Sequence, residues 1–263
     1  MNIFLTGASS GIGAALAREF ARRGAVLGLV ARRAQALQEL SAEYPGRCHT
    51  YALDVRDRAQ LLAAARDFEA RCGGTDMVIA NAGISTGVCT EYEEDLDVFE
   101  EVLAINLNAI VATFHPFIAA MRQRRRGTLV AIASVAGVRG LPGAEAYCPS
   151  KAALINYCES LRVGLHGSGI RVVTIAPGFI QTPMTEHNPY PMPFLMPVED
   201  FARQAAAAML RGTSYVVIPW QMAWVARLLR ILPNKVFDWF FAGRARKPRR
   251  SPRPDSKPPE ASS

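Results

Sequence analysis

The stretch Asn2-Ile-Phe-Leu-Thr-Gly-Ala-Ser-Ser-Gly-Ile-Gly13, followed by ten residues with helical spacing, decides the fold. Asn2 to Leu5 forms a short apolar strand, and the residues after Gly13 are strong helix formers. Between them, Gly7 permits a tight turn, Gly11 lets the backbone approach a pyrophosphate, and Gly13 lets the helix pack closely on the strand. A strand, a glycine turn and a helix in this order predict a dinucleotide site at the helix N-terminus.

The rest of the chain alternates buried strands with helical segments. Further strands are expected at 26–31, 47–53, 76–80, 127–133 and 170–176, and helices at 57–72, 95–123 and 144–166. This alternation predicts an α/β fold, a Rossmann-type doubly wound parallel sheet in a single domain with an appended C-terminal helical segment. We expect the domain to cover residues 1–218 with a lid at about 183–200, an amphipathic extension at 219–247, and a disordered basic tail at 248–263.

Three side chains suit proton transfer to or from an alcohol or carbonyl oxygen. Tyr147 and Lys151 are four residues apart, so on a helix they share one face. A nearby ammonium favours the phenolate, so we expect the pKa of Tyr147 to fall from roughly 10. Ser134 ends a buried strand, at the sheet edge where open α/β folds bind ligands. Alone, each residue is ordinary; a solvated lysine and a strand-end serine are the alternatives.

Other polar residues follow the strands that bound the predicted dinucleotide site. Arg32 and Arg33 follow the second strand, where an NAD enzyme usually carries an acidic residue; guanidinium groups suit a 2′-phosphate and favour NADP(H). The alternative is that both arginines begin a solvated helix. Asp54 and Asn81 come at the ends of the next two strands. Asn106 lies inside an apolar helical run, where it either distorts the helix or belongs to the site.

Composition narrows the class of protein. The 263 residues are 50% hydrophobic and 20% charged, which is typical of a globular chain. The five cysteines lack metal-ligand or disulfide spacing, and we expect no metal site. No signal peptide is expected, so we predict a cytoplasmic protein. Of the net charge of +7, the segment 244–263 carries +5.

Taken together, these motifs resemble the short-chain dehydrogenase/reductase family over roughly residues 2–218. The resemblance rests on the glycine motif, Asp54, Asn81-Ala-Gly83, Asn106, Ser134, Tyr147-x-x-x-Lys151, Pro177-Gly178 and Thr182, in the family's order. The family implies a catalytic tetrad in which Tyr147 is the general acid or base, Ser134 holds the substrate oxygen, Lys151 binds the nicotinamide ribose, and Asn106 orders a water.

The resemblance also implies a set of cofactor-binding residues. Asp54 would contact the adenine and Thr182 the nicotinamide carboxamide, while Asn81 and its neighbours would line the cleft. The cofactor-binding residues expected are Gly7, Ser9, Ser10, Gly11, Ile12, Gly13, Arg32, Arg33, Asp54, Val55, Asn81, Ala82, Gly83, Tyr147, Lys151, Pro177, Gly178, Ile180 and Thr182. A homodimer or homotetramer is implied by the resemblance alone.

The C-terminal extension departs from many family members. One helical face of residues 220–232 is apolar, with Arg227 and Arg230 opposite; its members are Trp220, Trp224, Val225, Leu228, Ile231 and Leu232. Beside the basic tail, this face suits the inner surface of a membrane, contacted through residues 220–250. The alternative is that these helices cover the substrate cleft or a subunit interface. No base-reading module accompanies the tail, so nucleic-acid binding is not expected.

These observations predict an NADP(H)-dependent oxidoreductase that interconverts a carbonyl and an alcohol on a small molecule. The expected lid is apolar, which suggests a lipophilic substrate; its apolar members are Met184, Tyr190, Met192, Phe194, Leu195 and Met196. The alternative is a catalytically idle NADP-binding sensor or scaffold of the same fold, attached or not to a membrane. An intact tetrad argues against a pure binder.

Overall fold

The computed structural model describes residues 1–186, 188–243 and 245–250. The strands are β1 (Asn2–Thr6), β2 (Val26–Ala31), β3 (Cys48–Ala52), β4 (Met77–Ala80), β5 (Gly127–Ile132), β6 (Ile170–Pro177) and β7 (Tyr215–Ile218). The α-helices are α1 (Gly11–Arg22), α2 (Ala34–Ala42), α3 (Arg58–Cys72), α4 (Glu94–Leu103), α5 (Ala109–Arg124), α6 (Tyr147–Gly164), α7 (Val198–Arg211), α8 (Gln221–Ile231) and α9 (Asn234–Phe241). A π-helix, η1 (Ala104–Asn108), and a 3-10 helix, η2 (Val135–Gly137), complete the elements.

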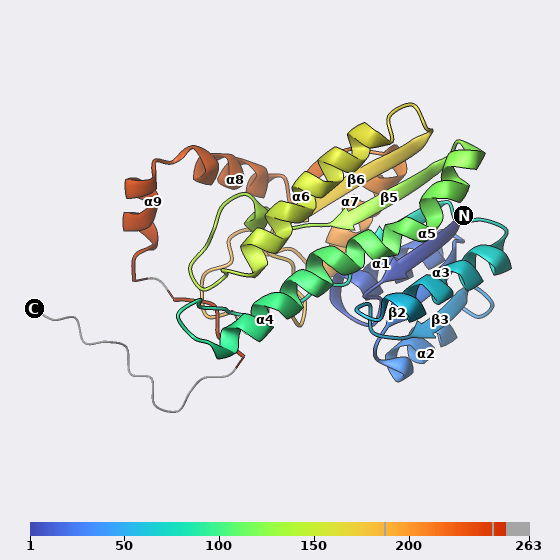
Figure 1. Cartoon of the computed structure of the whole chain (residues 1–263), viewed down its shortest axis with the longest axis horizontal. Helices are drawn as coiled ribbons and strands as arrows, with labels where there is room; N and C mark the ends of the chain where they lie inside the picture. The colour runs from blue at the N-terminus through green and yellow to red at the C-terminus, as the bar shows by residue number, and fades with distance from the viewer. Residues whose placement is uncertain (187, 244, 251–263) are drawn as a thin grey trace, which may run out of the picture.

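The seven strands form one parallel sheet in the order β3-β2-β1-β4-β5-β6-β7. Helices cover both faces, as Figure 1 shows. This confirms the predicted doubly wound sheet. The strand order reverses between β1 and β4, and a crevice outside the carboxyl ends of the strands at such a point is where open α/β sheets bind ligands. The glycine loop after β1 and Asn81 after β4 flank this point.

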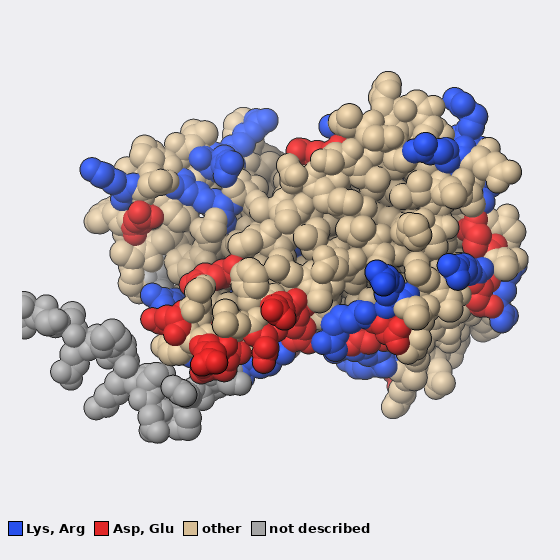
Figure 2. Space-filling model, in the orientation of Figure 1, with Lys and Arg blue, Asp and Glu red and all other residues tan. Residues whose placement is uncertain are grey.

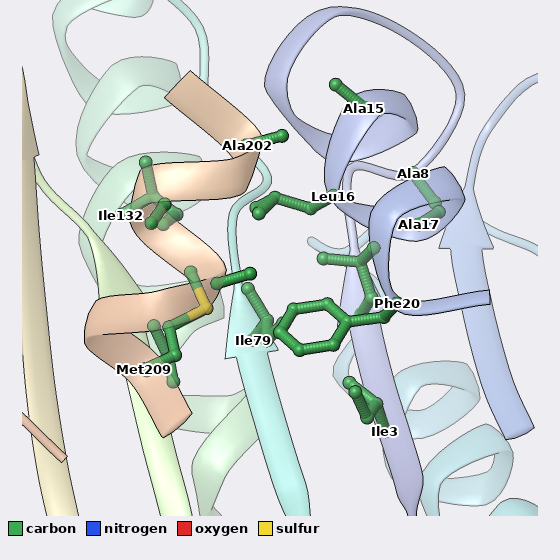
Figure 3. Packing of buried hydrophobic residues seen from close by; sticks show 14 of the residues in the cluster. Ile3, Ala8, Ala15, Leu16, Ala17, Phe20, Ile79, Ile132, Ala202 and Met209 are labelled. Carbon is green, nitrogen blue, oxygen red and sulfur yellow. The ribbon is translucent and has the colours of Figure 1, made fainter. Parts of the chain in front are cut away.

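Two hydrophobic cores lie on opposite faces of the sheet. Ile3 and Leu5 of β1 enter one core, and Phe4 between them enters the other, because side chains alternate along a strand. In the first core, residues of α1 and α7 pack against the strands; Figure 3 shows Phe20 of α1 beside Ile79 of β4. The second core is built from α3, α5 and α6 on the other face.

The predicted helix at 95–123 is three consecutive elements. From Glu94 to Arg124 the chain is continuously helical, but η1 inserts a wide turn between α4 and α5. This helix is long and apolar enough to cross a membrane by length and composition, since its most apolar 18 residues have a mean hydropathy of 1.7. Phe114 and Phe117 of α5 are fully buried in the second core, as in the core helix of a folded domain.

The C-terminal helices α8 and α9 fold back onto the loop that follows Ser134. Arg139 of this loop donates hydrogen bonds to the carbonyl oxygens of Leu229 and Leu232, and to Asn234 Oδ1 at 2.9 Å. Its guanidinium also lies 3.9 Å from the centre of the Phe237 ring. Arg139 thus provides hydrogen-bond donors for carbonyl groups at the end of α8 and holds the start of α9 against the loop.

Residues 245–250 lie against the domain. The amide of Gly87 donates to the carbonyl oxygen of Pro248 at 2.9 Å, and Arg249 forms ion pairs with Asp95 and Glu94. The sequence placed the start of a disordered tail at residue 248, but residues 248–250 are held by these contacts. Residues 251–263 of the predicted tail lie outside the described residues.

Candidate active site

The glycine loop forms a tight cradle above β1. Gly7 has φ of +70°, and a Cβ at this position would lie 2.8 Å from the Cα of Ala82. A Cβ on Gly13 would lie 2.0 Å from the carbonyl oxygen of Gly7. Only glycine fits at either position, so the loop brings its backbone close to the N-terminus of α1. This cradle fits the pyrophosphate of a dinucleotide.

The residues after β4 brace this loop from the side. Asn81 Nδ2 donates to the carbonyl oxygens of Thr6 and Gly7, each at 3.2 Å. The hydroxyl of Thr6 accepts hydrogen bonds from the amides of Asn81 and Ala82. The Asn81 side chain therefore stabilises the loop in addition to lining the cleft.

A cleft of about 540 Å³ runs along the carboxyl ends of the strands. All the cofactor-binding residues expected from the sequence line it except Gly13, which packs against the loop instead. Ser134 also lines the cleft, so three of the four expected catalytic residues lie there; Asn106 does not line it. Ile84, Ile105, Met184 and Thr185 line it as well and were not expected from the sequence.

Two arginines that follow β2 line one part of the cleft. Arg33 donates to the backbone oxygen of Ser9 at 3.0 Å and to its hydroxyl, while Arg32 is exposed at the cleft. Asp54 faces them and forms an ion pair with Arg56 at 2.7 Å. The hydrogen bond from Arg56 lowers the pKa of Asp54 below its usual value. The two arginines and the ionised Asp54 make the part of the cleft at the carboxyl ends of β2 and β3 polar.

Tyr147 and Ser134 lie where this cleft meets a second cavity, and both residues line both spaces. Tyr147 is the first residue of α6. Tyr147 is half-buried, desolvation raises its pKa to about 12, and a hydrogen bond with Ser134 acts in the opposite direction. Ser134 Oγ also accepts from the amide of Ala136 at 3.1 Å, which starts η2 and fixes the hydroxyl at the strand end.

Lys151 lies one turn along α6 from Tyr147, as the spacing predicted. Its Nζ is 5.9 Å from the centre of the Tyr147 ring and donates to the carbonyl oxygen of Ile132 at 2.9 Å. Burial lowers the pKa of Lys151 to about 8. We expected Lys151 to lower the pKa of Tyr147. In the protein alone this expectation is wrong, because desolvation raises the pKa of Tyr147 more than its neighbours lower it.

Asn106 is fully buried in η1 and joins three parts of the site. Its Oδ1 accepts from the amide of Ile84 at 2.9 Å, and its Nδ2 donates to the Ile84 carbonyl and to Ser150 Oγ, each at 3.0 Å. The first sequence alternative is confirmed, because Asn106 lies in the π-helix, whereas its membership of the site stays a prediction. Ser150, which precedes Lys151 in the motif, was not singled out from the sequence.

The second cavity, of about 880 Å³, extends from Tyr147 and Ser134 towards the C-terminal helices. Met222, Val225 and Leu229 of α8 line it, so α8 has an inward apolar face that the sequence pattern did not separate from the outward one. The sequence placed Val225 on the same face as Trp224, but Val225 faces the cavity. Phe240 and Phe241 of α9 also line this space.

The expected lid supplies only some of its apolar residues to this cavity. Met184, Tyr190 and Met192 line it, whereas Phe194 and Leu195 are exposed at 50% and 44%. Met196 packs on the first core instead. The segment ends where α7 begins, at Val198, slightly before the expected boundary at residue 200.

Comparisons with known proteins agree with this geometry. The profile of the short chain dehydrogenase family matches residues 1–191. An uncharacterized oxidoreductase of Myxococcus xanthus is 39% identical, over 89% of this chain and 93% of its own length. Mouse epidermal retinol dehydrogenase 2 is 33% identical over 89% of this chain and 78% of its own length. A 3-ketoacyl-ACP reductase structure from Sinorhizobium meliloti superposes with a TM-score of 0.76, at 27% identity, over 86% of this chain and all of the other.

Both the fold and the sequence of this chain therefore match those of known short chain dehydrogenases. The cleft, the glycine cradle and the three residues Ser134, Tyr147 and Lys151 lie on that fold. Members of this family are oxidoreductases that act on alcohol and carbonyl groups with NAD(P)(H). The chain belongs to the short-chain dehydrogenase/reductase family.

Proposed function

We propose that this protein is an NADP(H)-dependent oxidoreductase that interconverts a carbonyl and an alcohol on a lipophilic small molecule. The observation that carries the proposal is the position of Tyr147 and Ser134 between the cofactor cleft and the apolar cavity. A substrate in the cavity would present its oxygen to these two hydroxyls. The bound cofactor would supply or accept the hydride.

The chain's own residues hold and move the proton. Ser134, fixed by the amide of Ala136, donates a hydrogen bond to the substrate oxygen, and Tyr147 gives that oxygen a proton in reduction or takes it in oxidation. The raised pKa of Tyr147 keeps it protonated at neutral pH, which suits reduction. Lys151 binds the ribose of the cofactor, and Asn106 orders a water of the relay beside Lys151.

The choice of NADP(H) rests on Arg32 and Arg33. Both lie at the cleft after β2, and Arg33 is oriented by the backbone and hydroxyl of Ser9 in the glycine loop. A 2′-phosphate would bind between these guanidinium groups and the loop. The remaining cofactor contacts are proposed at the residues that line the cleft, with Asp54 near the adenine and Thr182 near the carboxamide.

The lipophilic substrate rests on the walls of the second cavity. Its apolar lining includes residues of the loop after β5, of the lid, and of both α8 and α9. Burying a substrate chain here contributes about 0.8 kcal/mol for each methylene group. The name of the mouse relative, a retinol dehydrogenase, fits this proposal.

The test is a fluorescence titration with NADPH and NADH, followed by NADPH oxidation with a panel of long-chain aldehydes, ketones and quinones. We expect tighter binding of NADPH and turnover that falls by about 10² to 10⁴ in Tyr147→Phe, which keeps the ring and loses the proton. Tight NADPH binding with no turnover across the panel would favour a sensor or scaffold. Failure to bind either cofactor would overturn the proposal.

We further propose that the protein attaches to the inner face of a membrane through residues 220–250, as a cytoplasmic protein. Trp220, directly before α8, is 66% exposed, and Trp224, Leu228 and Ile231 on the outward face of α8 are 63%, 56% and 77% exposed. Trp239 of α9 is 80% exposed. Figure 2 shows basic side chains on the lobe that α8 and α9 form; exposed Arg227, Arg230 and Lys235 belong to it. Aromatic side chains beside cations suit an anionic lipid surface.

Sedimentation with phosphatidylglycerol vesicles tests this attachment. Because α8 also lines the cavity, surface substitutions are preferable to deletion. We expect Trp224→Glu with Trp239→Glu to lower vesicle binding at least about tenfold, whereas Val163→Glu, on exposed α6, leaves it unchanged. Equal binding by both variants would overturn the attachment. A change in the sedimentation coefficient of the double variant without vesicles would assign this surface to contacts between copies.

We also propose a homodimer or homotetramer. Family members oligomerise. In a single chain, more than half of the most apolar 18 residues of the helix from Glu94 to Arg124 are not buried. Leu96 and Val111 are exposed along it, at 52% and 38%. A second copy packing on α4 and α5 would bury them. Sedimentation velocity should show an assembly that Val111→Lys weakens; a monomer at micromolar concentration would contradict this.

A further inference from the structure

The C-terminal segment carries a lysine into the substrate cavity. Lys247 lines this cavity, and its Nζ lies 5.4 Å from the centre of the Tyr147 ring. The ammonium donates to Ser85 Oγ, which lines the same space. Two glycines make room for the lysine backbone: a Cβ on Gly87 would lie 2.3 Å from the Lys247 carbonyl oxygen, and one on Gly143 would lie 2.9 Å from its amide nitrogen.

Unlike Arg249 and Arg250, Lys247 has no carboxylate partner among the described residues. Arg249 and Arg250 pair with Asp95, Glu94 and Glu101, whereas no ion pair of Lys247 is found within residues 1–186, 188–243 and 245–250. Lys247 is half-buried, and desolvation lowers its pKa below the usual value. A desolvated ammonium costs free energy unless an opposite charge lies beside it. The neutral Ser85 hydroxyl does not supply that charge.

The two lysines near Tyr147 have different surroundings. Lys151 is buried and donates to the main chain at Ile132, on the cofactor side. Lys247 lines the substrate cavity and not the cofactor cleft. A substrate group that reaches Lys247 therefore lies near the reacting oxygen but outside the cofactor cleft.

We propose that Lys247 binds a carboxylate of the substrate, so that the enzyme acts on oxo acids or hydroxy acids that carry an apolar chain. This rests on the proposed function and names its substrate class. The carbonyl lies at Ser134 and Tyr147, the carboxylate at Lys247 and Ser85, and the chain along α8 and α9. The carboxylate supplies the missing opposite charge and accepts hydrogen bonds from both side chains.

The experiment compares two matched substrates, 4-oxononanoate and nonan-4-one, which differ only by a carboxylate in place of a methyl group. The 2-oxo and 5-oxo acids of the same length vary the spacing. The wild type is compared with Lys247→Met, which removes the charge, and Lys247→Arg, which keeps it. Lys235→Met is the matched control, because Lys235 is exposed on α9 and does not line the cavity.

We expect the wild type to prefer an oxo acid to the ketone in kcat/KM, and Lys247→Met to reduce that ratio by at least about tenfold. Lys247→Arg should keep most of the preference, and Lys235→Met all of it. A ratio that is unchanged in Lys247→Met, or a wild type that prefers the ketone, would overturn the inference.

A binding measurement separates this inference from turnover. Calorimetry in the presence of NADP should show tighter binding of nonanoate than of nonanamide in the wild type, and loss of that difference in Lys247→Met. NADPH titration of each variant shows whether the cofactor cleft is intact. With NADPH binding and ketone reduction present but no carboxylate preference, only the Lys247 assignment fails; without them, the proposed function itself fails.

Discussion

The ammonium of Lys151 lies 5.9 Å from the centre of the Tyr147 ring, and its hydrogen bond goes to the backbone at Ile132. Two buried groups, one basic and one acidic, therefore face each other with both charged forms disfavoured. Burial lowers the pKa of Lys151 to about 8 and raises that of Tyr147 to about 12. The protein alone holds a neutral tyrosine next to a lysine that can lose its proton near physiological pH.

The first prediction concerns stability and the titration of Lys151. An unfolded lysine titrates near roughly 10.4, so between pH 8 and that value the unfolded chain binds more protons than the folded one. Stability of the wild type should therefore rise with pH in this window, relative to Lys151→Met, by up to about 3 kcal/mol. Urea unfolding at pH 7, 8.5 and 10 measures this. Parallel curves for the wild type and Lys151→Met would contradict it.

The second prediction concerns cofactor choice. Arg32→Ala and Arg33→Ala should each weaken NADPH binding by about tenfold or more while changing NADH binding little, because a charge-assisted hydrogen bond contributes roughly 1.5–3 kcal/mol. The effect at Arg33 includes loss of its bonds to Ser9. Fluorescence titration with both cofactors measures the ratio. Arg211→Ala, at the exposed end of α7, is the control; an equal loss for NADH in the cleft variants would refute a 2′-phosphate site.

The third prediction concerns Asn106, which acts through the backbone at Ile84. Asn106→Ala removes three hydrogen bonds and leaves the amide and carbonyl of Ile84 without this partner, so we expect a loss of about 2–4 kcal/mol of stability. Hydrogen exchange should quicken at Ile84 more than in β1. Asn106→Asp keeps an acceptor for the Ile84 amide and should lose less protection there. Uniform exchange in both variants would show that Asn106 does not hold this loop.

The sequence predicts those parts of the site whose positions follow from the order of the strands and helices along the chain. Parallel strands place their carboxyl ends at one edge, so Ser134, Asp54 and Asn81 follow from strand positions alone. Lys247 and Arg139 could not be predicted, because their partners are remote in sequence and depend on how α8 and α9 fold back. The sequence offered a distorted helix at Asn106 as one alternative, but it could not decide for it, since an apolar run has the same pattern with or without the extra residue in the turn.

The last prediction concerns the anchor of the C-terminal segment, Arg249. Its guanidinium pairs with Asp95, which is 1% exposed, at 2.7 Å, and lies 3.5 Å from the centre of the Tyr92 ring. Burial alone would raise the pKa of Asp95, but hydrogen bonds from Arg249 and the Cys89 amide lower it. Arg249→Ala leaves that carboxylate buried without its cation, so we expect a loss of about 3 kcal/mol at pH 7.

This loss should shrink as the pH falls towards and below the ordinary aspartate value near 4. The variant protonates its unpaired Asp95 first, and the wild type loses the stability that its ionised Asp95 contributes below that value. Urea unfolding at pH 7 and pH 4 measures both values. In an Asp95→Asn background, Arg249→Ala should cost far less, since no buried carboxylate then loses its cation. A loss that is the same at both pH values and in both backgrounds would mean that Arg249 acts only through its contact with Tyr92.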